Sequence, residues 1–225
     1  IFISVLAVTA VVIRKRILRI RDNIRLGKNE VSTENKAQRL KNLLLIAFGQ
    51  KKMFKKPVPA ILHLFIYVGF LVINIEVLEF VIDGVTGNHR SFAPYLGAFY
   101  NIPMNIFEFL AAAVFFSCVV FLLRRNVLKV RRFHMYEMTA WPRLDANIIL
   151  ITEIVLMVAI LSMNAADTVL QTRLPDHYPA TGKLFFSSIL VNSFSSLTTN
   201  TLIGIERFAW WFHILGILGF AIYIT

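Results

Sequence analysis

The sequence contains a single cysteine, Cys118. One thiol cannot form an internal disulfide, and it cannot hold an iron–sulfur cluster, which needs about four thiolate ligands. Any iron–sulfur cluster that works with this chain must therefore belong to a partner or to a region outside it.

Acidic residues are also scarce. The chain has 13 Asp and Glu against 24 Lys and Arg, which gives a formal charge of +11 at pH 7. A charge of this size can indicate a nucleic-acid partner. Here, however, the basic residues form two blocks beside apolar segments, which is the pattern of a cytoplasmic membrane face. We therefore exclude nucleic acid as the partner.

Apolar residues, in contrast, are abundant. They make up 57% of the 225 residues and include 20 Phe, whereas soluble domains contain roughly half. The composition indicates a membrane protein, and helices are the default there because lipid offers no hydrogen-bond partner to an open strand. We predict an all-α membrane bundle of about five transmembrane helices. The five apolar segments are Ile1–Ile13, Pro57–Ile82, Pro103–Leu123, Ala146–Ala165 and Phe208–Thr225.

The distribution of Lys and Arg predicts the orientation of these segments. The connection Arg14–Lys56 contains fourteen basic residues, and the connection Arg124–Arg143 contains six. The other two connections contain only one and three. Basic connections stay in the cytoplasm, so the second and fourth segments should run from inside to outside, and the third and fifth from outside to inside.

Both ends of the sequence look cut. Residues 1–13 are too few for a span, which needs about 20, and the chain closes on "FHILGILGFAIYIT" in the middle of an apolar run. We expect a fragment with three parts: a partial first transmembrane helix (1–13), a basic cytoplasmic connection (14–56), and a four-helix membrane domain truncated at its C-terminus (57–225).

Two connections should contain helices of their own. In "STENKAQRLKNLLLIAFG", apolar residues recur at helical spacing opposite lysines and Gly49 ends the pattern, which predicts an amphipathic helix on the inner membrane surface. It would serve either as a linker or as a docking surface. On the outer side, "GKLFFSSILVNSFSSL" is too short and too rich in serine to span, and should cap the bundle.

Two of the five histidines lie in apolar segments. Ionisable residues inside a bilayer are costly and usually functional, so His63 and His213 are candidate axial ligands of haem iron, because neutral imidazole is a common iron ligand. The alternative for each is a neutral histidine bonded to a neighbouring carbonyl. His134 and His177 lie in connections, where a solvated side chain is the better interpretation.

The depths of His63 and His213 in the membrane favour two separate sites. Each lies six residues inside a boundary, at Pro57 and Arg207, or roughly 9 Å deep from opposite faces. In a core of ~30 Å this leaves ~12 Å between them along the normal. Two ring nitrogens on one metal are only about 4 Å apart.

The motifs "AILHLFIYVGF" and "ERFAWWFHILGILGF", with the serine-rich segment just before the second, resemble the haem-b membrane subunit of respiratory nitrate reductase (the gamma-subunit family). They also resemble its relatives that serve heterodisulfide-reductase-like iron–sulfur proteins. The resemblance covers about residues 50–225. It implies that His63 is the inner haem ligand of the second helix and that His213 is the outer ligand of the fifth.

The partners of these two ligands depart from the family pattern. The resemblance places the inner partner beyond Thr225, near position 231, and the outer partner about ten residues past His63. Ile73 and Asn74 stand there instead. His89 is the nearest alternative ligand on the outer side, and Arg90 beside it could pair with a haem propionate. A surface histidine in a loop is the competing interpretation of His89.

Carboxylates also fall in the apolar segments. Glu76 and Glu108 lie towards the outer end and are candidate acceptors of the protons that a quinol loses on oxidation. Glu79 and Asp83 lie near them, and for Glu79 a charge at the water boundary, or one paired with Arg90, is the alternative. Glu153, in the inner part of the fourth segment, is expected to bond to a neighbour in the bundle.

Taken with the resemblance, these features predict a membrane b-type cytochrome domain in a bacterial or archaeal cytoplasmic membrane. It would carry one or two haems b and transfer electrons between menaquinone or ubiquinone and an iron–sulfur protein or domain on the cytoplasmic side, possibly fused downstream. The sequence leaves two alternatives open: a proton-coupled transporter using Glu76, Glu108 and His213, and a non-catalytic membrane anchor.

Overall fold

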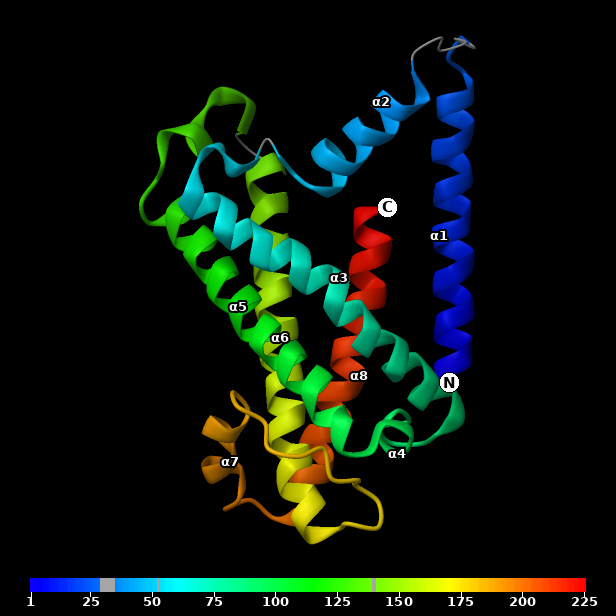
Figure 1. Ribbon diagram of the computed structural model, residues 1–225, viewed down its shortest axis with the longest axis vertical. Helices are drawn as coiled ribbons and strands as arrows, with labels where there is room; N and C mark the ends of the chain where they lie inside the picture. Colours follow the sequence, from blue (N-terminus) through cyan, green and yellow to red (C-terminus); the bar gives the residue numbers. More distant parts are fainter. Residues whose placement is uncertain (29–34, 52, 139–140) are drawn as a thin grey trace.

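The computed structural model describes residues 1–28, 35–51, 53–138 and 141–225, and these residues form helices and connecting turns without any strand (Figure 1). The long helices are α1 (Phe2–Arg25), α3 (Pro57–Thr86), α5 (Asn101–Asn126), α6 (Trp141–Arg173) and α8 (Thr199–Ile224). The prediction of an all-α bundle is therefore confirmed.

Among the described residues, four stretches of helix are long and apolar enough to cross a membrane, so the chain is a multi-pass membrane protein. They are Pro57–Thr86, Ala93–Asn126, Trp141–Arg173 and Thr199–Ile224. The second of these combines α5 with the short helix α4 (Ala93–Leu96) and the 3₁₀ turn η3 (Gly97–Tyr100), which precede it directly.

The first expected segment behaves differently from the other four. It continues past Ile13 as one helix to Arg25, so the basic connection begins inside α1. The added turns carry Arg and Lys, and α1 is not among the stretches apolar enough to span. It lies along the edge of the bundle (Figure 1). Near its start, Phe2 packs on Trp210 and on Gly84, where a Cβ would lie 2.5 Å from the Phe2 ring. Farther along, Arg16 donates a hydrogen bond to the carbonyl of Ile222.

The four spanning stretches pack through neighbouring pairs. Helix α6 packs on α8 and on α5, and α5 packs on α3. Gly69 of α3 lets α5 approach closely, since a Cβ there would lie 2.5 Å from Cγ2 of Val114. Gly216 does the same for α8, because its Cβ would meet Cδ2 of Leu156 at 2.6 Å.

The two shorter expected helices are present. The amphipathic segment forms α2 (Lys36–Asn42), in which the side chain of Asn35 accepts the N–H of Ala37, followed by a π-helical turn η1 (Leu43–Phe48) that ends at Gly49. The beginning of that expected segment, residues 32–34, lies outside the described residues. The serine-rich segment forms α7 (Ser188–Phe194), which packs on α6.

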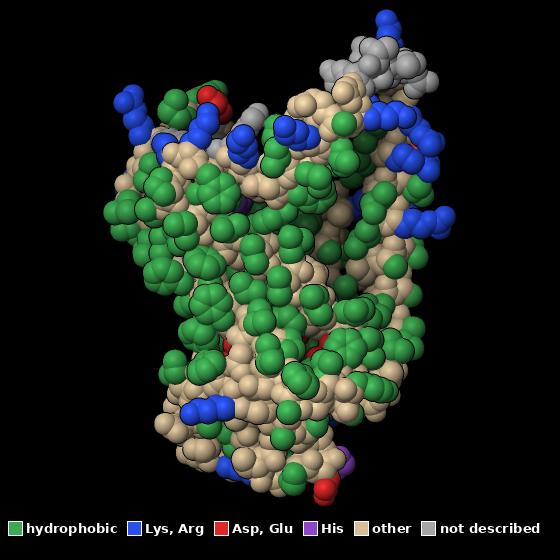
Figure 2. All heavy atoms as spheres, viewed as in Figure 1, with side chains coloured by type: hydrophobic (Ala, Val, Ile, Leu, Met, Phe, Trp, Pro, Cys, Tyr) green, Lys and Arg blue, Asp and Glu red, His purple; other side chains and the backbone are tan. Residues whose placement is uncertain are grey.

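The two basic connections lie at the same end of the bundle, where Lys and Arg side chains gather over the upper surface of Figure 2. Helices α4 and α7 lie at the other end (Figure 1). We refer to the basic end as the inner end and to the end with α4 and α7 as the outer end. The remaining helical turns are η2 (Met53–Lys55), η4 (Arg131–His134) and η5 (Tyr136–Met138).

Candidate functional site

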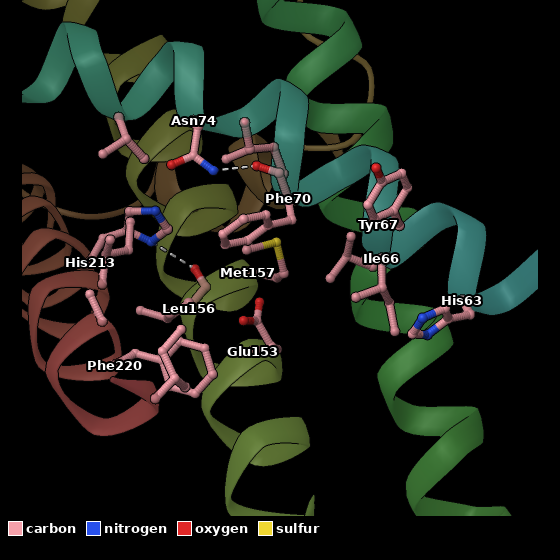
Figure 3. A pocket seen from close by; sticks show the side chains of 16 residues that line it. His63, Ile66, Tyr67, Phe70, Asn74, Glu153, Leu156, Met157, His213 and Phe220 are labelled. Atoms are coloured by element: carbon pink, nitrogen blue, oxygen red, sulfur yellow. Dashed lines mark hydrogen bonds between the residues drawn. The ribbon is translucent and has the colours of Figure 1, made fainter. Parts of the chain in front are cut away.

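A cavity of about 350 Å³ lies among α3, α6 and α8, and we call it the α3–α6–α8 cavity. Its volume is at the lower end of the range that ligand pockets occupy. The walls are mainly apolar, and a few polar side chains reach them: His63, Tyr67 and Asn74 from α3, Glu153 from α6 and His213 from α8. Figure 3 shows this cavity with His213 and His63 at its opposite ends. Two of the residues predicted from sequence thus share one cavity.

His213 is anchored by only one of its two ring nitrogens. Its Nδ1 lies 3.1 Å from the carbonyl oxygen of Leu156 on α6 (Figure 3). A carbonyl only accepts hydrogen bonds, so Nδ1 carries the proton and Nε2 is left with a free lone pair. The side chain is 1% exposed, and Nε2 has no hydrogen-bond partner among the described residues. A buried acceptor without a donor is costly and calls for an explanation.

His63 borders the same cavity but is exposed. It lies in the second turn of α3, which begins at Pro57, on the inner half of the helix. His213 lies in the middle of α8.

Other side chains complete the cavity wall. Asn74 stands where the family pattern places a haem ligand, and its amide donates to the carbonyl of Phe70 in its own helix (Figure 3). Glu153 is half-buried, points toward the cavity, and has no ion pair or hydrogen bond among the described residues. The bundle partner expected for Glu153 is thus not found in that part of the chain.

A second group of predicted residues gathers at the outer end, in what we call the outer network. It contains six carboxyl groups, each at most 6% exposed, from four helices. They are Glu76, Glu79 and Asp83 of α3, Glu108 of α5, Asp167 of α6 and Glu206 of α8. Three of them come from one helix because spacings of three, four and seven residues share a helix face.

Arg90 is the cation at the centre of the outer network. Its guanidinium is 2% exposed and lies 3.6 Å from Glu76 and 3.4 Å from Asp167. Nη2 also donates to Oδ1 of Asn164 at 2.6 Å. Burial alone would lower the pKa of Arg90, but Tyr100, Asp167 and Glu76 outweigh it and hold that pKa well above its ordinary value. Arg90 is therefore a permanent cation, and it partly neutralises the buried acids.

Three carboxylates of the network, Asp83, Glu79 and Glu108, accept hydrogen bonds from backbone N–H groups of the connections. Asp83 accepts the N–H groups of Arg90 and Ser91 at 3.0 and 2.9 Å, which fixes Arg90 at a left-handed φ of 55°. Glu79 accepts the N–H of Phe92 and the hydroxyl of Tyr100. These bonds determine the path of the chain between α3 and α4.

Glu108 has the same role for the chain before α7. It accepts the N–H of Phe186 and both the N–H and the hydroxyl of Ser187. Asn164 donates to it as well, at 3.3 Å, and so joins Glu108 to Arg90. The predicted site residues Glu76, Glu108 and Arg90 therefore belong to one connected cluster.

His89 belongs to the outer network and not to the α3–α6–α8 cavity. Its Nε2 lies 2.9 Å from Oδ1 of Asp167, and its Nδ1 lies 3.8 Å from Oε1 of Glu206. The ring packs edge-on against Tyr178 at 4.8 Å. Burial, and next the charge of Glu206, raise the pKa of Tyr178. His89 therefore does not line the α3–α6–α8 cavity, and both of its nitrogens face carboxyl groups of the outer network.

Two carboxylates of the network, Asp167 and Glu206, are not among the residues singled out from the sequence. The apolar segments predicted there end at Ala165 and begin at Phe208, two residues short of each acid. The helices themselves continue to Arg173 and begin at Thr199. The sequence offers one signal for Asp167: it lies one helical turn after Asn164, so both side chains fall on the same face of the helix.

Comparison with known proteins relates the chain to an oxidoreductase. It is 25% identical over 202 residues to the probable iron–sulfur-binding oxidoreductase FadF of Bacillus subtilis (strain 168). The match covers 89% of this chain and 26% of FadF, so the chain spans about a quarter of the length of that relative. No family model and no solved structure matches the chain. What the chain resembles is thus one part of a longer iron–sulfur-binding oxidoreductase.

Proposed function

We propose that the chain is a membrane domain that binds b-type haem and transfers electrons between a membrane quinone, menaquinone or ubiquinone, and an iron–sulfur partner at the inner end. The observation that carries the proposal is the state of His213: it is buried at an apolar cavity, fixed through Nδ1, and has no partner at Nε2 in the part of the chain that the structure describes. Histidines that bind metals usually donate their other N–H to a carbonyl or carboxylate in this way.

The residues around the cavity fit a haem group. His213 would supply Nε2 as an axial ligand, with its tautomer already set by Leu156. The apolar wall of α3, α6 and α8 would exclude water from the macrocycle. His63 would supply a second imidazole from the other end of the cavity, for the same haem or for a separate one. Bound haem b supplies a centre that accepts and releases one electron at a time.

The iron–sulfur partner is supported by the relative and by the composition of the chain. FadF is described as iron–sulfur-binding, and the part that matches this chain is only 26% of its length. This chain has one cysteine, which is buried. A cluster would therefore be held by another domain or subunit, and the basic inner end would face it.

The test is a reduced-minus-oxidised absorbance spectrum of the purified chain, expressed with haem supplied and tested for reduction by a quinol. We expect b-type haem bands, and reduction by the quinol. A well-folded chain that shows no such bands would overturn the proposal. The haem-to-protein ratio then gives the number of haems directly.

Single substitutions assign the ligands. His213→Ala should abolish the bands of the haem it binds, whereas His177→Ala, an exposed histidine in the outer connection, should leave them unchanged. If there are two haems, His63→Ala should remove a different set of bands. If there is one shared haem, both substitutions should remove the same set. Since His213→Ala also loses the bond to Leu156, His213→Gly with added imidazole separates ligation from folding: the bands should return with imidazole.

A further inference from the structure

A second, smaller pocket opens beside the outer network, and we call it the outer pocket. Its volume is about 160 Å³, and a cavity of roughly 150 Å³ is enough to hold a benzene ring. Its lining includes the aromatic residues Phe2, Trp210 and Trp211. The ionisable residues Asp83, His89, Glu206 and Arg207 line it as well. It therefore offers room for one aromatic ring, with ring faces to pack on and polar groups to meet a hydroxyl.

The hydrogen-bond pattern fixes the tautomer of His89. Asp167 accepts bonds from Gln171 at 3.1 Å and from Arg90 at 3.4 Å, as an ionised carboxylate does. His89 Nε2, 2.9 Å from Asp167, must then be the donor of that pair. Its Nδ1 consequently carries a lone pair and faces Glu206 across a gap of 3.8 Å. That gap is too long for a direct hydrogen bond.

Glu206 lacks the hydrogen-bond donors that other members of the network have. Its Oε2 is buried without a hydrogen-bond partner among the described residues, and Arg207 lies 3.6 Å away on the exposed side. By contrast, Asp83, Glu79 and Glu108 each accept at least two hydrogen bonds. Six buried carboxyls around one arginine cannot all be charged. Glu206 is therefore one of the carboxyl groups able to hold a proton.

A continuous row of aromatic rings connects the outer pocket to the proposed haem ligand. Trp210 lines the pocket and meets Phe80 edge-on at 6.2 Å. Phe80 in turn meets the ring of His213 at 5.7 Å. The contacts Trp210–Phe80 and Phe80–His213 thus connect the outer pocket with the α3–α6–α8 cavity.

We propose that the outer pocket binds the ring of a hydroquinone, and that His89 accepts a proton from the ring hydroxyl. The hydroxyl would lie between Nδ1 of His89 and Glu206, while Asp167 positions the imidazole through Nε2. This inference rests on the proposed function and specifies its quinol site. It assigns proton acceptance to His89, with Glu206 as the second hydrogen-bonding partner of the hydroxyl, in place of Glu76 and Glu108, which do not line the outer pocket.

The proposed oxidation conserves atoms and electrons. Oxidation of a hydroquinone to a quinone breaks two O–H bonds and releases two protons and two electrons. The proton of the hydroxyl that faces His89 passes to Nδ1 and from there to water, since the side chain of His89 is 22% exposed. The second hydroxyl, on the opposite side of the ring, releases its proton to water. The electrons leave one at a time to a one-electron acceptor, the haem b of the proposed function. No other oxidant is needed.

Binding can be measured without any haem through tryptophan fluorescence. The chain has three tryptophans, and two of them line the outer pocket. In a Trp141→Phe background only these two remain, so duroquinol, kept reduced under anaerobic conditions, should quench their emission with a saturable dependence on concentration. Glu206→Gln and His89→Gln should each weaken this binding about tenfold, the loss expected for one hydrogen bond to the ring. His177→Gln is the control that should not change it.

Linear, non-saturable quenching in the Trp141→Phe chain, or equal affinities in the Glu206→Gln and His177→Gln variants, would overturn the inference. A second measurement tests the proton. With duroquinol as the reductant, His89→Gln should reduce haem at least tenfold more slowly while its absorbance bands stay normal; an unchanged rate would refute the role of His89. Saturable binding by a chain that takes up no haem would leave the pocket standing and refute the proposed function instead.

Discussion

Replacing Arg90 with methionine is a direct test of how the outer end is held together. Arg90 is 2% exposed, lies 3.6 Å from Glu76 and 3.4 Å from Asp167, and donates to Asn164 at 2.6 Å. Methionine preserves the apolar bulk but removes the charge, so two buried carboxylates lose their cation. Breaking a buried ion pair in this way costs about 3–5 kcal/mol. The free energy of unfolding should fall by that amount.

The one cysteine of the chain provides the assay. Cys118 is buried and 0% exposed, so a thiol reagent reaches it only after the bundle opens. Under conditions where opening and closing are fast, the labelling rate follows the population of the open state. Since each 1.4 kcal/mol is a factor of ten, Arg90→Met should speed the labelling of Cys118 by about 100-fold to several thousandfold.

Arg207→Met is the matched control, because Arg207 is 72% exposed and its pair with Glu206 is open to solvent on the arginine side. Such pairs contribute at most about 1 kcal/mol. If Arg90→Met stays within about fivefold of the wild-type labelling rate, a difference of about 1 kcal/mol, then Arg90 does not neutralise the network and the reasoning about its charges is wrong.

Three further predictions concern the helices, and the same labelling assay checks them. Gly69→Ala should destabilise the bundle by about 1–3 kcal/mol, because the new Cβ would lie 2.5 Å from Cγ2 of Val114. Val114→Ala in the same chain should recover part of this loss of stability. If it recovers none, the contact with Val114 is not the cause. Gly219→Ala should stabilise α8 by about 0.5–1 kcal/mol, since nothing lies within 4 Å of its Cβ, and faster labelling would contradict this. Thr198→Ala should cost about 1 kcal/mol through loss of the cap at the start of α8, where Oγ1 accepts the N–H of Thr201 at 3.3 Å; Thr198→Ser should restore it.

The spanning helices could be predicted because their apolar runs are long and are separated by basic or proline-containing connections. Their ends could not, since a helix continues past the last apolar residue when its polar side chains find partners inside the bundle. Asp167 is the clearest case: it lies beyond the apolar segment, yet it is 0% exposed because His89, Arg90 and Gln171 donate to it.

The positions of His63 and His213 in apolar segments are enough to predict that they are candidate haem ligands. The structure adds their contacts, which depend on how the helices pack. The contact between His213 and Leu156 depends on how α8 meets α6, which no spacing within α8 reveals. The same holds for His89. Its sequence neighbours place it in a loop, whereas its partners Asp167 and Glu206 come from helices that are far away along the chain.

The two ends of the bundle also differ in how they hold charge, and a membrane voltage acts on that difference. Lys and Arg gather on the surface of the inner end (Figure 2), while six carboxyl groups are enclosed at the outer end. If the inner end lies in the cytoplasm, as the distribution of Lys and Arg predicts, it lies on the negative side of an energised membrane and the voltage favours this arrangement. Turning the molecule over would cost about 2.3 kcal/mol per 100 mV for each elementary charge carried across. An energised membrane therefore helps to hold the chain in one orientation.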